Sequence, residues 1–257
     1  MPNYEKPTKT LMTEWASQHL VPNQIFTKAE PVRWFAEHFP KTRSTTVTMH
    51  VDGMSTNNLN RRHHPSIKPG SGHDLFYKLN SSQYRLYAPE TDPKPLYKET
   101  IEKGEQPIDP GAITTAGETE DEEEYGAKGA SEFAFERDLQ NYLVKNLHMV
   151  EPGLRLYEDE GISGVQYPVG GRFIDILAVD HEGKLVVIEL KVSRSYDRVI
   201  GQLLRYMGWV ERNIDGAKQV RGVIVANEIS EDLKLACSRI PDVRLIEYKI
   251  AFSLRRV

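Results

Sequence analysis

The sequence contains very little cysteine. Cys237 is the only one among 257 residues, so neither an internal disulfide nor a thiolate zinc site can form. A chain with this composition is typical of a reducing compartment, where thiols stay reduced.

Long apolar runs are also lacking. No stretch approaches the ~20 apolar residues that a membrane-spanning helix requires. The first residues, "MPNYEKPTKTLMTEW", lack the apolar core of a secretory signal. A hydrophobic content of 39% and a charged content of 27% are typical of globular proteins. We therefore expect a cytoplasmic protein with no membrane partner.

The charges are unevenly distributed along the chain. Residues 1–90 contain 11 Lys/Arg and 7 Asp/Glu, a balance of +4. Residues 91–130 contain 4 Lys/Arg and 11 Asp/Glu, a balance of −7. Residues 131–257 contain 18 Lys/Arg and 19 Asp/Glu, a balance of −1. The overall charge of −4 therefore does not exclude a polyanionic partner for the basic N-terminal third.

The acidic middle segment predicts a domain boundary. Residues 91–130 are rich in Pro, Gly, Thr and acidic residues and have no apolar period, which favours a flexible linker. We therefore expect two domains, residues 1–90 and residues 131–257.

Residues 1–90 show helical apolar spacing followed by a hairpin pattern. "MTEWASQHL" and "AEPVRWFAEHF" predict helices, and Ser44 can cap a third. Alternating segments on either side of Asn80-Ser81-Ser82 predict a hairpin. Helices followed by a hairpin are typical of a winged-helix domain, in which the third helix enters a DNA groove. A small helical domain used for dimerisation or partner binding is the alternative.

The third predicted helix and the loop after it are rich in side chains of the types that contact phosphates and base edges. The candidate DNA-binding residues are Lys41, Arg43, Thr45, Thr46, Asn58, Arg61 and Arg62. The nearby His63 and His64 are adjacent rather than four apart, so a metal site there is not expected.

Residues 131–257 predict a compact mixed α/β domain. The expected order is a helix from 131 to 150, strands at 172–179 and 184–192, a helix through 195–213, a strand at 220–227, a short helix at 230–239 and a strand at 243–250.

The two central strands place charged residues in an apolar pattern. The turn "DHEGK" predicts a three-residue loop with Gly183 in the left-handed conformation. If Asp180 pairs with Lys184, the residue numbers of any two cross-strand partners in the hairpin sum to 364. Asp175 would lie opposite Glu189, with Cβ atoms roughly 4.5–5.5 Å apart. Lys191 follows two residues later on the same face.

Two carboxylates at that separation would repel each other unless positive charge lies between them. A divalent cation would supply it, and a set of oxygen ligands favours Mg²⁺ or Mn²⁺. The alternative is a buried ion pair with a purely structural role. Three charged residues in one register favour a site.

The pattern Asp175…Glu189-Leu190-Lys191 resembles the PD-(D/E)xK nuclease superfamily. "GGR" at 170–172 and "GQLLRYMGWV" at 201–210 are similar to the C-terminal catalytic domain of NucS-type endonucleases. This resemblance covers about half of the chain, from residue 131 onward, and implies a restriction-endonuclease-like α/β fold with a mixed sheet flanked by helices.

The resemblance also implies roles for individual residues. Asp175, Glu189 and the backbone carbonyl of Leu190 would bind the metal. Lys191 would orient the attacking water or neutralise the transition state, and Gln202 would hold the water or Lys191. Glu136 matches an acidic residue on the first helix, with Glu132 and Asp138 as competitors. Arg172 would contact phosphate or only cap the edge of its strand.

The resemblance implies Mg²⁺-dependent hydrolysis of DNA, with Mn²⁺ as a substitute. We expect duplex DNA as the partner, a homodimer, and a restriction-like or DNA-processing role in which the N-terminal domain selects the site. The alternatives are a DNA-binding regulator with an inactive nuclease fold and a structure-specific repair or single-strand nuclease. The N-terminal half does not resemble that of NucS, so a mismatch-repair role is not carried over.

Overall fold

The structure is a computed structural model that describes residues 4–58, 61, 66–97, 130–169, 172–191, 198–214, 217 and 219–250. The chain divides into two compact units. The first comprises Met1–Glu118 with Glu158–Ser163, and the second comprises Thr119–Tyr157 with Gly164–Val257. Within the described ranges, no helix has the length and apolar character required to cross a membrane.

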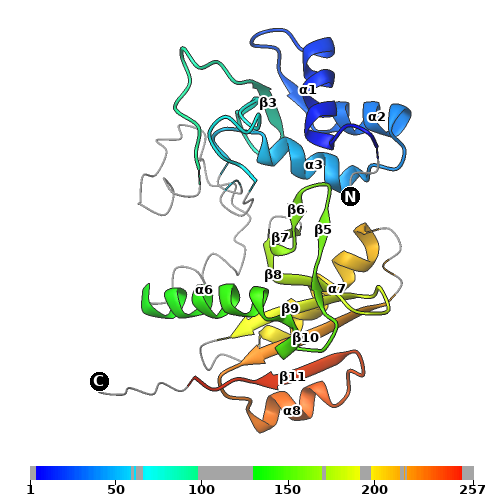
Figure 1. Cartoon of the computed structure of the whole chain (residues 1–257), viewed down its shortest axis with the longest axis vertical. Helices are drawn as coiled ribbons and strands as arrows, with labels where there is room; N and C mark the ends of the chain where they lie inside the picture. The colour runs from blue at the N-terminus through cyan, green and yellow to red at the C-terminus, as the bar shows by residue number, and fades with distance from the viewer. Residues whose placement is uncertain are drawn as a thin grey trace. The chain divides into compact units, whose positions relative to one another are not determined.

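The first unit combines helices with a small antiparallel sheet (Figure 1). Its elements before residue 98 are α1 (Thr8–His19), β1 (Phe26–Thr27), α2 (Ala29–His38), α3 (Ser44–Gly53), β2 (Phe76–Lys78) and β3 (Gln83–Leu86). The sheet order is β1-β3-β2. The predicted helices and the predicted hairpin are therefore confirmed; the short strand β1 was not predicted.

Aromatic side chains form the core of this unit. Trp15 from α1 and Phe35 from α2 are buried together with Phe26 and Phe76 from the sheet. The Phe26 and Phe76 ring centroids lie 4.9 Å apart, within the range in which ring pairs add to the energy of apolar burial.

The first unit extends beyond the predicted boundary at residue 90. Leu96 is buried, and its backbone N–H donates to the Thr56 carbonyl at 2.8 Å. The start of the predicted linker is therefore packed against the unit. Residues 98–129 lie outside the described part of the chain.

A short acidic hairpin from later in the sequence also belongs to the first unit. It consists of β5 (Glu158–Asp159) and β6 (Ile162–Ser163). The Thr8 hydroxyl donates to Glu160 Oε2 at 3.0 Å. Residues 158–163 fall within the range predicted for the C-terminal domain, 131–257, so their place in the first unit was not predicted.

The second unit is a mixed sheet flanked by helices (Figure 1). Its elements are α6 (Ala130–Lys145), the 3₁₀ turn η2 (Leu147–Met149), β4 (Arg155–Leu156), β7 (Val165–Val169), β8 (Arg172–Val179), β9 (Leu185–Lys191), α7 (Val199–Asn213), β10 (Val220–Ala226), α8 (Glu231–Cys237) and β11 (Val243–Glu247). The sheet order is β11-β10-β9-β8-β4, with β7 also paired to β8. The predicted fold class is confirmed, although β4 and β7 were not predicted.

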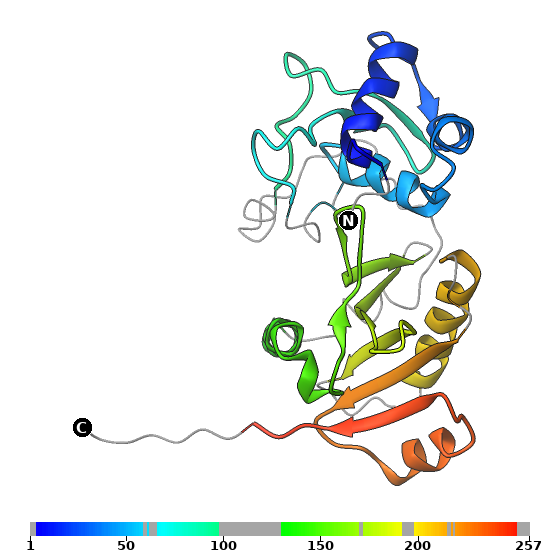
Figure 2. The same ribbon diagram turned by 45° about the vertical axis from the view of Figure 1, so that its right-hand side comes forward.

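Helices cover both faces of this sheet. Figure 2 shows α6 on one face and α7 on the other. On the α6 face, Leu139 and Leu143 pack with Ile176, Ile188 and other buried residues of β8, β9 and β10. The parallel strands β9, β10 and β11 are joined through α7 and α8, and right-handed crossovers place both helices on the same face.

On the other face, Gly222 lets α7 approach β10 closely. A Cβ atom at this position would lie 2.7 Å from Leu203 Cδ2 and 2.8 Å from Met207 Sδ, which is too close for real carbon contacts. The separation of α7 from the sheet therefore depends on this glycine.

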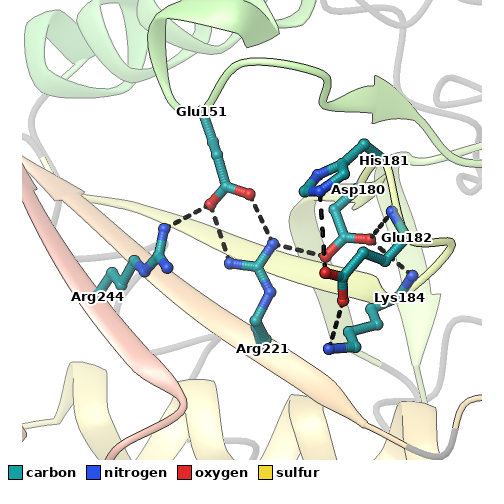
Figure 3. A network of polar contacts seen from close by, with 7 residues as sticks. All are labelled: Glu151, Asp180, His181, Glu182, Lys184, Arg221 and Arg244. Carbon is teal, nitrogen blue, oxygen red and sulfur yellow. Dashed lines mark hydrogen bonds and ion pairs between the residues drawn. The ribbon is translucent and has the colours of Figure 1, made fainter.

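A charged network ties strands together at one end of the sheet (Figure 3). Arg221 in β10 donates to Glu151 Oε2 at 2.9 Å and to Asp180 Oδ2 at 2.8 Å. Arg244 in β11 also donates to Glu151, at 2.8 Å. Because Val220 pairs with Leu185 and Ala226 with Lys191, the network lies at the end of the sheet opposite Lys191.

The network holds both of its carboxyl groups in the charged form. The hydrogen bonds from Arg221 lower the pKa of Glu151. Burial alone would raise the pKa of Asp180, but the backbone N–H of Lys184, the Arg221 side chain and the backbone N–H of Glu182 outweigh it, and the pKa falls. Both groups therefore add stability above their unfolded pKa values of about 4, and this stability is lost as the pH falls through the folded values.

We expect Arg221→Ala to destabilise the second unit by about 2–3 kcal/mol at pH 7, because it leaves the charges of the buried Asp180 and the half-buried Glu151 without their shared donor. The difference from the unsubstituted protein should shrink as the pH falls below about 4 and through the lowered folded pKa values, where both carboxyl groups become protonated. Native-state hydrogen exchange of the β10 amides measures this difference in stability.

The matched control is Lys184→Ala, which breaks the exposed ion pair with Glu182 and should cost about 0–1 kcal/mol. Equal effects of the two substitutions, or no dependence on pH, would contradict this account of the network.

Candidate active site

Three charged side chains are buried where β8 and β9 separate. Asp175 is on β8, and Glu189 and Lys191 are on β9. Only 8%, 2% and 4% of these residues is exposed, respectively. Charged residues are almost never buried this deeply unless they are paired or bind an ion. Their burial in one place makes this part of the sheet the candidate active site.

The predicted register is confirmed along the hairpin. Ile176 pairs with Ile188 and Leu177 with Val187, so paired numbers sum to 364. Gly183 has φ 84°, as expected for the turn. The paired residues stop at Ile176–Ile188, one step before the predicted pair Asp175–Glu189.

Beyond that step, a side chain replaces the backbone ladder. The Leu190 N–H donates to Asp175 Oδ2 at 2.8 Å. This charge-assisted hydrogen bond fixes the Asp175 carboxylate between the two strands, next to the segment that carries Glu189 and Lys191.

Lys191 connects the strand to helix α7. Its Nζ lies 3.3 Å from Glu189 Oε1 and donates to Gln202 Oε1 at 3.5 Å. Gln202 Nε2 donates in turn to the Tyr206 hydroxyl at 3.2 Å. Because Gln202 and Tyr206 are one helical turn apart, α7 presents both to the same place. The structure thus brings Lys191 and Gln202 together.

Glu189 is held in an environment that disfavours its charge. Burial, the neighbouring Asp175 and Glu136 raise its pKa well above the usual range, and Lys191 only partly opposes them. Its Oε2 atom is buried and accepts no hydrogen bond. An added cation would satisfy this oxygen and relieve the repulsion between the acids.

Two side chains of α6 face the site. The Gln140 amide donates to the Asp175 backbone carbonyl at 2.8 Å. Glu136, one turn earlier on the same helix face, is close enough to raise the pKa of Glu189. Its competitor Asp138 is exposed, and the side chain of Glu132 lies outside the described residues. The structure therefore favours Glu136. Gln140 was not predicted, although its spacing of four from Glu136 was visible in the sequence.

Gln166 is a contact of Asp175 that was not predicted from the sequence. It has φ 47°, a left-handed conformation that residues other than glycine rarely adopt. Its Nε2 donates to Asp175 Oδ1 at 3.0 Å. Strained backbone of this kind is concentrated at functional sites. No signal in the sequence predicts this conformation.

The structure corrects two of the predicted DNA contacts. Arg61 is buried and donates to the Leu96 and His73 carbonyls and to Asp74. Asn58 is buried and its amide donates to Asp52 at 3.1 Å. Both side chains hold the loop after α3 in place, because burial in this loop demands partners for their polar groups. Neither offers a surface for DNA.

The other predicted DNA contacts differ in their exposure. The buried Thr46 hydroxyl donates to Asp159 Oδ2 at 2.5 Å, and Arg43 lies 3.7 Å from the same carboxylate. Lys41 is exposed, whereas Thr45 and Arg172 are half-buried. Arg62 lies outside the described residues, as do His63 and His64.

Within the described residues, no group of three or more His, Cys, Asp or Glu side chains could hold a metal ion. A cation between β8 and β9 would therefore be held by the carboxylates of Asp175 and Glu189 together with backbone oxygen and water.

Comparison with known proteins matches two parts of the chain to two different families. Residues 135–247 match the family described as "Endonuclease NucS C-terminal domain". Residues 7–86 match a separate family, described as a domain of unknown function (DUF7669).

The curated relatives are endonucleases named NucS. The NucS of Pyrococcus abyssi is 28% identical over 45% of this chain and 41% of its own length. The NucS of Methanocaldococcus jannaschii is 25% identical over 70% of this chain and 61% of its own length. NucS 2 of Halobacterium salinarum is 36% identical over 37% of this chain and 35% of its own length. The chain thus spans less than two thirds of the length of these relatives.

Two solved structures are each similar to somewhat less than half of the chain. A repair endonuclease from Pyrococcus abyssi shares 21% identity over 48% of this chain and 47% of its own, with a TM-score of 0.37. A structure titled as an EndoMS–dsDNA complex shares 22% identity over 45% of this chain and 46% of its own, also with a TM-score of 0.37.

We expect Gln166→Gly to separate the role of Gln166 at the site from its backbone strain. Glycine accepts the left-handed conformation without cost, so stability should not fall, but the amide that orients Asp175 is lost. Removing such an indirect contact typically costs 10–100-fold in metal affinity. Calorimetric titration with Mn²⁺ measures this loss, and thermal unfolding measures stability.

Asn23→Gly is the matched control, since Asn23 also has a positive φ, 65°, but lies in the first unit. It should leave Mn²⁺ binding unchanged. Unchanged Mn²⁺ affinity in Gln166→Gly would show that Asp175 is oriented without Gln166.

Proposed function

We propose that this chain, whose residues 135–247 form a NucS-type PD-(D/E)xK domain, is a metal-dependent DNA endonuclease that hydrolyses phosphodiester bonds. The observation that carries the proposal is the burial of Asp175, Glu189 and Lys191 in one place. Such a cluster is costly for a fold and useful for chemistry on a charged substrate.

The residues present fit a hard divalent cation. Glu189 Oε2 is buried and without a hydrogen bond. The atoms that the site offers to a metal are oxygens, which favours Mg²⁺ with Mn²⁺ as a substitute. The N–H and C=O of one strand residue point to the same edge. Since the Leu190 N–H faces Asp175, its carbonyl faces the same side and completes the set. Bound Mg²⁺ supplies Lewis-acid polarisation of the phosphate and a lowered pKa for a water molecule.

Lys191 carries the positive charge that the chain itself contributes. Its ammonium is positioned by Glu189 and by the Gln202 amide. In a site shielded from water, a fixed cation stabilises the charge that develops on the phosphate oxygens more strongly than in solution. Gln202, held by Tyr206, keeps Lys191 in place.

The N-terminal unit is proposed to select the DNA site. Its order α1-β1-α2-α3-β2-β3 supports a winged-helix domain with α3 as the recognition helix. Lys41, Arg43 and Thr45 remain the candidate contacts there, and Arg172 remains one in the second unit. Because Asp159 holds Arg43 and Thr46, duplex DNA must displace this carboxylate to reach them.

Cleavage of both strands requires two active sites, so we infer that two copies of the chain act together. A structure-specific repair endonuclease is the second candidate function, favoured by the NucS-type sequence of residues 135–247. The restriction-like role stays a prediction.

We expect the full chain to cut plasmid and branched DNA with Mg²⁺ or Mn²⁺ and to be inactive in EDTA. Lys191→Ala should reduce the cleavage rate by ~10²–10³, the usual cost of one electrostatic group at such a site. Asp175→Ala should abolish metal-dependent cleavage. Gel assays that resolve nicked from linear plasmid measure both rates and show whether one or both strands are cut.

Lys184→Ala is the control for Lys191→Ala, since Lys184 lies at the turn of the same hairpin and is paired with Glu182. It should cut like the unsubstituted protein. Cleavage in EDTA would refute the metal mechanism. DNA binding without any cleavage would instead favour a regulator with an inactive nuclease fold.

A further inference from the structure

Helix α7 carries three arginines spaced seven residues apart. They are Arg198 at its N-cap, Arg205 and Arg212, hereafter the α7 arginine stripe. Seven residues complete almost two full turns, so the three lie within about 40° of one another around the helix. At 1.5 Å per residue, the stripe is about 21 Å long.

The stripe is exposed and lacks compensating charge. All three residues are exposed, and within the described part of the chain none of them forms an ion pair or side-chain hydrogen bond. By contrast, Arg85 and Arg221 are bound to carboxylates. The only acidic residue in α7 is Glu211, which lies about 100° around the helix from Arg212.

The stripe borders the proposed active site at one end. Gln202, which contacts Lys191, lies one turn after Arg198 and one before Arg205. Because α7 connects the end of β9 to the start of the parallel strand β10, it runs from the active-site end of the sheet to the opposite end. The stripe follows the same path.

Two glycines leave the helix surface beside the stripe without side chains. Gly201 and Gly208 are also seven residues apart, and a Cβ at either would meet no atom within 4 Å. No packing within the described chain therefore explains them, although each costs about 1 kcal/mol relative to alanine in a helix. They leave room for a backbone to approach the arginines.

We propose that the α7 arginine stripe binds the phosphate backbone of DNA on one side of the cleaved bond. Phosphates follow one another at 3.4 Å of helix axis per strand, so a stripe of about 21 Å spans about six of them. This inference rests on the proposed function and adds to it a sequence-independent binding surface on the nuclease unit.

The test compares two double variants of the full chain. Arg205→Gln with Arg212→Gln removes two charges from the stripe. Arg155→Gln with Arg239→Gln removes two exposed charges, one in β4 and one two residues after α8, with the same change in net charge. Fluorescence anisotropy with a 30-bp duplex in EDTA, over a range of NaCl concentrations, gives the Kd and its salt dependence.

The stripe variant should weaken binding about tenfold and lower the slope of log K against log salt by about 2, close to 0.9 for each lost phosphate contact. The control variant should bind like the unsubstituted protein. The cleavage rate at saturating DNA should be unchanged in the control variant, because Arg155 and Arg239 belong neither to the candidate site nor to the stripe.

The outcomes separate this inference from the proposed function. If the protein cuts DNA but the two double variants bind it alike, the stripe does not contact phosphates and the inference is overturned. If DNA binding depends on the stripe but no cleavage occurs with Mg²⁺ or Mn²⁺, the inference about the stripe is supported and the nuclease proposal fails. A protein that neither binds nor cuts DNA overturns both.

Discussion

The hydrogen bond from the Leu190 N–H to Asp175 Oδ2 is the interaction on which the candidate site depends. At this point β8 and β9 stop pairing through their backbones, and a carboxylate takes the place of a ladder carbonyl. The bond satisfies a donor that would otherwise be buried and unpaired, and it fixes one acid beside another. The raised pKa of Glu189, caused by burial and by Asp175, follows from this placement.

A fold that buries like charges at one end of a sheet must gain stability elsewhere. In this domain the opposite end supplies it, because Arg221 joins Asp180 and Glu151, and Arg244 adds a further contact to Glu151. Charges in this network are opposite in sign and hydrogen-bonded, whereas those around Glu189 are not fully compensated. This division, with one end satisfied and the other strained, is common in proteins that keep a reactive site at the expense of stability.

The sequence predicted the parts of the site that are fixed by local periodicity. The bounds of β8, the register of the hairpin and the left-handed Gly183 follow from alternation and turn chemistry. Gln166 could not be predicted, because its positive φ depends on the tertiary contacts of β7. Arg61 looked like a DNA contact because a basic residue in a polar loop is usually exposed. Its burial depends on Leu96, 35 residues later, which no local pattern reveals.

Helix α7 links the two proposed activities of the second unit, chemistry and DNA binding. Its buried side packs on Gly222, where no larger residue would fit without moving Leu203 or Met207. Its edge holds Gln202 against Lys191, and its outer face carries the arginine stripe. Because one helix presents all three surfaces, its packing on Gly222 bears on both the contact from Gln202 to Lys191 and the position of the proposed phosphate-binding stripe. If the stripe binds DNA as proposed, the helix that places Gln202 beside Lys191 would also place the phosphate backbone.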